Sequence, residues 1–336
     1  MITVTTDMPD NKTVVHWQVS RFCEKSCHYC TAYDFMQTIK KDKAVLHHPK
    51  DKIELDDHIA TLLPQVVTNG NILLFGGEPT LHPRGIDYFN SLCYNTKENP
   101  DVAIFLVTHG DIDLDKIDNI ETHNKQEHIV SISYHYYQVE FNEWIKKVKR
   151  FNKKSNVLVS AIIPRSEKVW KQFENNILEL FAEGISVDVK SELDNKTNLP
   201  DPKGFKHFKD LYEIGRKTQN EIMKKLDTRT LYIFDGNNIE TVHATENALP
   251  LKPKFTFCNT RQYTIADDIL KVSCDEGGHL TLTQSTTADD IKKFTKGDII
   301  SCSKSFCSEN RVAFPATVKI LDAKLEDYKD FIASQL

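Results

Sequence analysis

Three thiols fall within eight residues in the stretch Cys23-Glu24-Lys25-Ser26-Cys27-His28-Tyr29-Cys30, directly after an apolar run at residues 14–19. The apolar run predicts the first strand of a domain, so the thiols follow the end of that strand. Three thiolates from one loop can hold three irons of a cubic iron–sulfur cluster, and the fourth iron then stays open to a substrate or cofactor. An open iron is a chemical site, and the stretch therefore predicts an enzyme.

Closely spaced cysteines also occur in structural zinc sites and in disulfide frameworks. Zinc needs a fourth ligand, and the nearest candidate, His28, sits awkwardly between two of the cysteines. Disulfide frameworks are typical of short secreted domains, whereas this chain has 336 residues and shows no secretion signal over residues 1–12. An iron–sulfur cluster is favoured, and zinc stays the alternative.

A second motif, Gly76-Gly77-Glu78-Pro79-Thr80, follows the apolar run at residues 72–75. Cys-x3-Cys-x2-Cys with an aromatic residue before the last cysteine, followed by Gly-Gly-Glu-Pro, resembles the radical S-adenosylmethionine (radical SAM) family. The resemblance implies a [4Fe–4S] cluster on Cys23, Cys27 and Cys30, with S-adenosylmethionine (AdoMet) at the open iron. It also implies a 5′-deoxyadenosyl radical that abstracts a hydrogen from a substrate.

Residues of both motifs are expected to surround the cofactor. Gly76 and Gly77 lack a Cβ and so permit close approach of the chain to AdoMet. Glu78 and nearby carbonyl groups would accept hydrogen bonds from the AdoMet amino group, and Pro79 fixes the turn. Tyr29, at the aromatic position of the first motif, is assigned to the cofactor by the resemblance alone.

Apolar runs alternate with amphipathic stretches as far as about residue 225, which predicts an α/β fold with a parallel sheet. The resemblance implies a partial (β/α)6 barrel over residues 1–226 and a small β-rich metal-binding extension over 227–336. Within the extension, turn residues 235–238 between apolar runs at 231–234 and 239–243 predict a hairpin, and apolar residues at helical spacing over 321–332 predict a closing amphipathic helix. Predicted strands cover residues 14–19, 72–75, 102–107, 128–133, 157–163 and 185–189, and predicted helices cover 56–67, 85–94, 139–151 and 167–181. Lysines and an arginine within 146–154 are assigned to the solvated face of the third of these helices.

Chemistry in parallel α/β folds gathers where the strands end, which selects further candidates. Family members often have Ser-x-Asp after the fourth strand, where this chain has Ser133-Tyr134-His135. The resemblance assigns Ser133 and Thr108 to the cofactor, but His135 cannot inherit the role of a carboxylate. We expect His135 and Tyr136 to act as proton donor, base or aromatic wall, with plain packing as the alternative. Arg165 is a candidate for holding a carboxylate of AdoMet or substrate.

Four more cysteines, Cys258, Cys274, Cys302 and Cys307, lie in the C-terminal region. Four thiols can hold one auxiliary [4Fe–4S] cluster or one structural zinc. Radical SAM enzymes with such an extension resemble the twitch and SPASM groups, although Ile269 replaces an expected glycine and the last cysteine spacing differs. An auxiliary cluster is favoured over zinc, with unliganded thiols a third possibility. A cluster here would favour net oxidation, such as dehydrogenation or crosslink formation.

Composition limits the classes of partner that we expect this protein to bind. The net charge of −5 gives no basic field for nucleic acid, and no apolar run is long enough to span a membrane. The default location is the cytoplasm. The resemblance implies an external electron donor such as flavodoxin or ferredoxin, and only about a dozen residues precede the first strand, so any leader-binding protein would be a separate partner.

The substrate is predicted as a peptide side chain or a small metabolite. One alternative is a radical SAM enzyme acting on a nucleotide or sugar, with structural zinc at the C-terminus. The alternative from another class is an iron–sulfur or zinc protein that keeps the fold but performs no radical chemistry.

Overall fold

The computed structural model describes residues 12–25, 27, 50–123, 128–190, 207–211, 214–215, 230–234, 239–243, 255–258, 260–272 and 279–295. Among these residues, no helix is both long enough and apolar enough to cross a bilayer.

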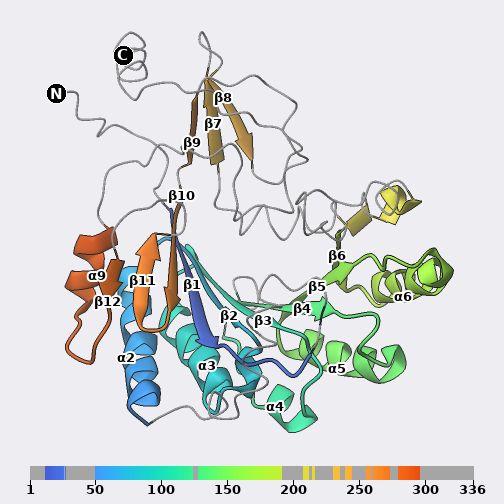
Figure 1. Ribbon diagram of the computed structural model, residues 1–336, viewed down its shortest axis with the longest axis horizontal. Coiled ribbons are helices and arrows are strands. Elements are labelled where there is room, and N and C mark those ends of the chain that lie inside the picture. The colour runs from blue at the N-terminus through green and yellow to red at the C-terminus, as the bar shows by residue number, and fades with distance from the viewer. Residues whose placement is uncertain are drawn as a thin grey trace.

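Six parallel strands form the centre of the molecule (Figure 1). They follow one another in chain order and are β1 (Lys12–Ser20), β2 (Gly70–Gly76), β3 (Val102–Thr108), β4 (His128–Tyr134), β5 (Asn156–Ile162) and β6 (Ser186–Lys190). All six predicted strands are confirmed, and across the described part of the chain the sheet stays open. The prediction of a partial α/β barrel is therefore confirmed.

Helices cover the outer face of this sheet. They are α2 (Lys50–Val66), α3 (Gly85–Thr96), α4 (Leu114–Asp118), α5 (Phe141–Lys154) and α6 (Trp170–Ala182), with short 3-10 turns η2 (Pro79–Leu81) and η3 (Glu167–Val169). Alternate strand residues divide between two apolar clusters. Ile104 and Leu106 join the large cluster beneath the helices, whereas Ala103 and Phe105 join a small cluster on the opposite face.

Helix α5 confirms the prediction of an amphipathic helix with a solvated basic face. Its apolar residues, among them Trp144 and Val148, are buried. The basic residues pair with acids of neighbouring elements: Lys147 with Asp111, Lys149 with Glu183 and Arg150 with Asp118. Paired charges of this kind explain the basic run without a phosphate ligand.

A second sheet contains β8 (Ile239–His243), β7 (Thr230–Phe234) and β9 (Phe255–Cys258), in that order. Strands β7 and β8 pair antiparallel, with Leu231 opposite Val242, as the sequence predicted. The amphipathic helix expected near the C-terminus, at 321–332, lies outside the described residues.

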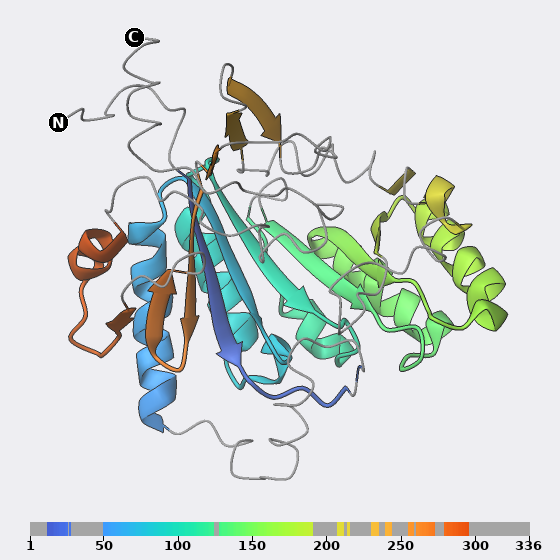
Figure 2. The same cartoon turned by 45° about the horizontal axis from the view of Figure 1, so that its top comes forward.

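Strand β10 (Thr260–Ala266) joins the main sheet, parallel to β1 and on the side away from β2. Strands β11 (Ile269–Val272) and β12 (His279–Thr281) continue the sheet antiparallel, and α9 (Ala288–Thr295) follows. Among the described residues, the main sheet therefore has nine strands, and it runs across the boundary expected at 226/227. Figure 2 shows this added edge beside β1, with the second sheet beyond the starts of β1 and β10.

The turn between β10 and β11 ties the added edge to the rest of the domain. Asp267 and Asp268 both have positive φ, 52° and 64°, as tight hairpin turns require. Asp267 pairs with Arg21, which follows β1, and Asp268 pairs with Lys52 of α2 at 3.0 Å. The edge is thereby fixed close to the chain that leads into Cys23.

Candidate active site

The ends of β1, β2, β3 and β4 bring the predicted motifs to one rim of the sheet, because parallel strands end on the same side. Cys23 and Cys27 follow β1, Gly76 ends β2, and Gly77–Pro79 follow it. Thr108 ends β3 and His135 follows β4. Cys30 and Tyr29 lie outside the described residues.

Gly76 and Gly77 hold the cysteine loop against β2. The Gly77 N–H donates to the Ser20 carbonyl at 2.8 Å, and the Glu78 N–H donates to the Phe22 carbonyl at 2.6 Å. A Cβ on Gly76 would lie 2.0 Å from the Ser20 oxygen, and one on Gly77 would lie 2.1 Å from the Phe22 oxygen. We expected these glycines to make room for AdoMet, but the space at their Cβ positions is filled by the chain that leads to Cys23.

Pro79 is buried and begins the η2 turn, where its fixed φ suits the first position. Its carbonyl accepts a hydrogen bond from His82 N–H at 3.0 Å. Pro79 therefore fixes the turn, as expected.

Glu78 is 1% exposed and joins the loop after β2 to the loop after β3. One carboxylate oxygen accepts from Thr80 N–H at 3.0 Å, from the Thr80 hydroxyl at 2.6 Å and from the Thr108 hydroxyl at 2.8 Å. The other oxygen accepts from His109 N–H at 2.8 Å. We expected this carboxylate to receive the AdoMet amino group, but protein donors engage both oxygens. Thr108 is likewise buried against Glu78.

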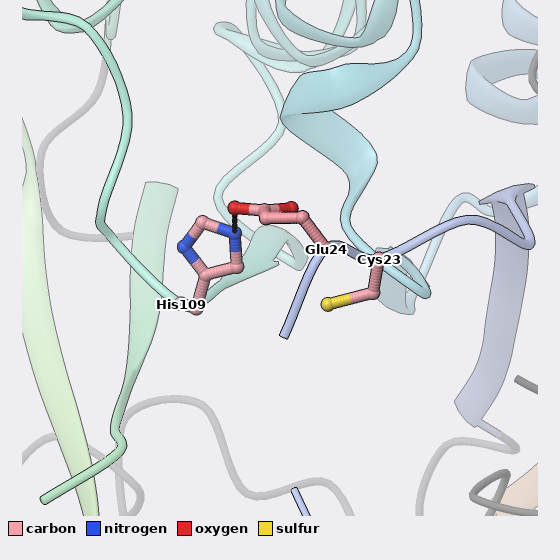
Figure 3. A group of neighbouring side chains, drawn as sticks. All are labelled: Cys23, Glu24 and His109. Carbon is pink, nitrogen blue, oxygen red and sulfur yellow. Dashed lines mark ion pairs between the residues drawn. The ribbon is translucent and has the colours of Figure 1, made fainter. Parts of the chain in front are cut away.

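His109 extends this network to the cysteine loop (Figure 3). Its Nε2 lies 2.7 Å from Glu24 Oε1 and 3.3 Å from Glu78 Oε2. Its Nδ1 accepts from Asp111 N–H at 3.0 Å, which leaves the ring proton on Nε2. Burial alone would raise the pKa of Glu24, but the contact with His109 outweighs it and lowers that pKa. Ligand atoms of Cys23, Glu24 and His109 lie within 4.8 Å of one another.

Lys25 provides a second anchor for the same loop. Its ammonium group lies 2.7 Å from one oxygen of Asp111, whose other oxygen lies 2.6 Å from Lys147 of α5. Burial raises the pKa of Asp111, but the hydrogen bonds from Lys147 and then Lys25 outweigh it and lower the pKa to about 2. The strand-end rule selected the loop that contains His109 but gave this histidine no role. Sequence reasoning missed Glu24, Lys25 and Asp111, although two opposite charges inside the cysteine motif were a visible signal.

The two described thiols of the first motif have different surroundings. Cys27 is 7% exposed, and the Gln138 side-chain amide donates to its Sγ at 3.1 Å. His135 Nδ1 lies 3.2 Å from the same sulfur. Burial, followed by the nearby acids Glu24 and Glu78, raises the pKa of Cys23 to about 12 despite a backbone hydrogen bond. Nitrogen donors that face the Cys27 sulfur suit a metal-bound thiolate, so the surroundings of Cys27 fit a ligand of an iron–sulfur cluster.

The surroundings of His135 and Tyr136 bear on the expected catalytic roles of these residues, which stay predictions. Burial, followed by the nearby side chains of His109 and Lys25, lowers the pKa of His135 to about 4, and Nδ1 faces the Cys27 sulfur. The Tyr136 ring packs edge-on against Tyr134, with centroids 6.2 Å apart, and equally against Phe173 of α6. The packing alternative therefore describes Tyr136, whereas His135 belongs to the surroundings of the cysteine loop.

Ser133 lies next to the last residue of β4, and Arg165 lies in the loop after the neighbouring strand β5. Ser133 lies opposite Ser160 of β5 and, by strand alternation, on the same face as Ile129 of the small apolar cluster. Arg165 follows β5 and is exposed. The assignment of both to cofactor contacts stays a prediction.

Cys258 lies at the opposite end of the sheet from Cys23. It ends β9, two residues before Thr260, which pairs with Lys12 at the start of β1. The chain leaves β11 at Val272, opposite Tyr263 of β10, two residues before Cys274. Strand β11 therefore runs back toward the end at which Cys258 lies. Cys274, Cys302 and Cys307 lie outside the described residues.

Comparisons with known proteins agree with this fold. Hexahistidine-tagged anSMEcpe with bound AdoMet has a similar fold, with a TM-score of 0.51 and 14% identity over 96% of this chain and 92% of that one. Native anSMEcpe with bound AdoMet aligns with a TM-score of 0.49 and 14% identity over 96% of each chain. A search of curated proteins found no match. The family model of the radical SAM superfamily matches residues 17–191, a little over half of the chain. The chain therefore belongs to the radical SAM superfamily.

Proposed function

We propose that this protein is a radical SAM enzyme that holds a [4Fe–4S] cluster on Cys23, Cys27 and Cys30 and binds AdoMet at the same rim. The observation that carries the proposal is the Cys27 sulfur, buried in the loop after β1 and facing the side chains of His135 and Gln138. The reduced cluster and AdoMet would supply a 5′-deoxyadenosyl radical, which abstracts a hydrogen from the substrate.

The residues of the chain hold this centre in place. Gly77 and Glu78 bind the backbone just before Cys23, and Glu78 in turn holds Thr108 and His109. With both Glu78 oxygens engaged, the AdoMet amino group is left to backbone carbonyls of the same rim. Glu78 then acts through the loops that it joins, as a positioning residue. Tyr29, Ser133 and Arg165 are proposed as further cofactor contacts.

We propose further that Cys258, Cys274, Cys302 and Cys307 hold one auxiliary [4Fe–4S] cluster, with structural zinc as the competing outcome. The nine residues of β1 span roughly 25 Å at about 3.3 Å per step. Cys258 lies near the start of that span, and Cys23 follows its end. Cys258 is therefore remote from the AdoMet rim. A cluster there would serve as an electron acceptor at the far end of the sheet, which favours net oxidation of the substrate.

The proposed substrates are a peptide side chain or a small metabolite, and the proposed electron donor is a flavodoxin or ferredoxin. A separate leader-binding protein is proposed for a ribosomal peptide substrate. A panel of peptides, amino acids, sugars and nucleotides would be tested for a rise in 5′-deoxyadenosine formation. An increase with one class alone identifies the substrate class, and an increase with nucleotides or sugars alone would replace the peptide proposal.

Metal analysis of the Cys23→Ala/Cys27→Ala/Cys30→Ala variant, reconstituted without oxygen, separates the two sites. Loss of about four irons per chain relative to the unsubstituted protein supports the proposed first cluster. About four irons left in the variant support the auxiliary cluster, whereas zinc or no metal there would overturn it. Equal iron in both proteins would contradict the first assignment.

A further inference from the structure

We propose that His135 and Gln138 raise the reduction potential of the cluster by donating two hydrogen bonds to the Cys27 thiolate. The inference rests on the proposed function, because it needs the cluster on that cysteine. It gives His135 a role other than proton transfer to substrate, and it gives Gln138 a role that no motif indicates.

The geometry brings both nitrogens to one sulfur. Gln138 Nε2 lies 3.1 Å from Cys27 Sγ, and His135 Nδ1 lies 3.2 Å from it. Both residues belong to the segment between β4 and α5. The Gln138 N–H donates to the His135 carbonyl at 2.8 Å, and this turn places the two side chains together.

A ligating thiolate offers acceptor capacity only, so both nitrogens must donate to it. Cys27 is 7% exposed, so water competes little for the sulfur. Hydrogen bonds to ligand sulfurs are one of the factors that set the potential of an iron–sulfur cluster. The reduced cluster carries one more negative charge than the oxidised cluster, so donors at the sulfur stabilise the reduced form more. Removing a donor should therefore lower the potential.

Neighbouring positions allow a matched set of variants. His135→Leu removes the ring donor, whereas His135→Asn keeps an N–H at the δ position. Gln138→Leu removes the other donor. Tyr137→Phe is the control, because Tyr137 lies in the same segment with its side chain exposed and its hydroxyl near Ser166 N–H at 3.4 Å.

The experiment is a redox titration of the anaerobically reconstituted full-length protein, followed by electron paramagnetic resonance. The change in the spectrum on adding AdoMet identifies the cluster with the open iron. Each leucine variant should shift the reduction equilibrium by about tenfold toward the oxidised form, about 59 mV for one electron. His135→Asn should regain much of the shift, and Tyr137→Phe should match the unsubstituted protein.

Two results would overturn the inference, and they differ in kind. A loaded, AdoMet-responsive cluster whose potential is the same in the leucine variants and in Tyr137→Phe would refute the role of His135 and Gln138 alone. No AdoMet-responsive cluster in the unsubstituted protein would refute the proposed function. If His135→Leu fails to fold or to bind iron, Gln138→Leu decides, because Gln138 is only partly buried.

Discussion

Replacing Glu78 with Gln should lower the free energy of unfolding, even in protein without metal. The substitution keeps the size of the side chain but exchanges one carboxylate oxygen for an amide NH2 group. The hydrogen bonds that this carboxylate accepts come from Thr80 N–H, from the hydroxyls of Thr80 and Thr108, and from His109 N–H. Whichever way the amide turns, at least one buried donor of the protein then faces another donor.

The better orientation places the amide NH2 toward His109, since the other oxygen receives three bonds. His109 N–H then loses its acceptor, at a cost of about 1–3 kcal/mol for a buried unsatisfied group. The three remaining bonds change from charged to neutral, which weakens each by up to about 1 kcal/mol. Together the loss should be about 1–6 kcal/mol.

Urea unfolding of the metal-free protein measures this loss through the shift in midpoint. Thr108→Val removes one donor to Glu78 and the acceptor of the Gly110 N–H, and should lose about 1–3 kcal/mol. Glu143→Gln, at a side chain 68% exposed, should leave the midpoint unchanged. A loss below about 1 kcal/mol for Glu78→Gln would show that the carboxylate does not hold the two loops together.

Three further predictions concern the same framework. Gly77→Ala should lose about 1–3 kcal/mol of unfolding free energy and bind less iron, because its Cβ would lie 2.1 Å from the Phe22 oxygen; normal iron content would argue against the close contact. Asp111→Asn removes the charge between Lys25 and Lys147, and should speed the loss of iron to a chelator, with Asp101→Asn, an exposed residue, as the control. Burial, followed by repulsion from His123, lowers the pKa of His128 to about 4, so the unfolded state binds more protons between about pH 6.5 and 4. Stability should fall by up to about 3 kcal/mol as the pH drops through that window; His128→Leu should lose this part of the pH dependence, and an unchanged pH profile would refute the assignment.

The sequence predicted the six parallel strands because each is an apolar run bounded by turn residues, and such runs are local features. Strand β10 was not foreseen beside β1, because residues nearly 250 positions apart form that pair and no local pattern reports it. The observed start of α2 at Lys50, before the expected residue 56, reflects the polar composition of its first turn.

The same difference between local patterns and long-range contacts applies to the candidate site. The rule that chemistry gathers at strand ends selected the loops after β1 to β4, and these loops do meet. It could not tell which side chains face each other. Glu24 and His109 belong to different loops, and His135 faces a cysteine sulfur. Those contacts depend on the tertiary arrangement, so sequence reasoning assigned His135 to catalysis.

The central claim is that the cysteines after β1 hold a cluster that starts radical chemistry with AdoMet. The most direct test measures 5′-deoxyadenosine after anaerobic reconstitution, reduction and addition of AdoMet, in the full-length protein and in Cys27→Ala. We predict formation of 5′-deoxyadenosine by the unsubstituted protein and none by the variant. A loaded, reduced unsubstituted protein that forms none, or a variant that forms as much, would contradict the claim.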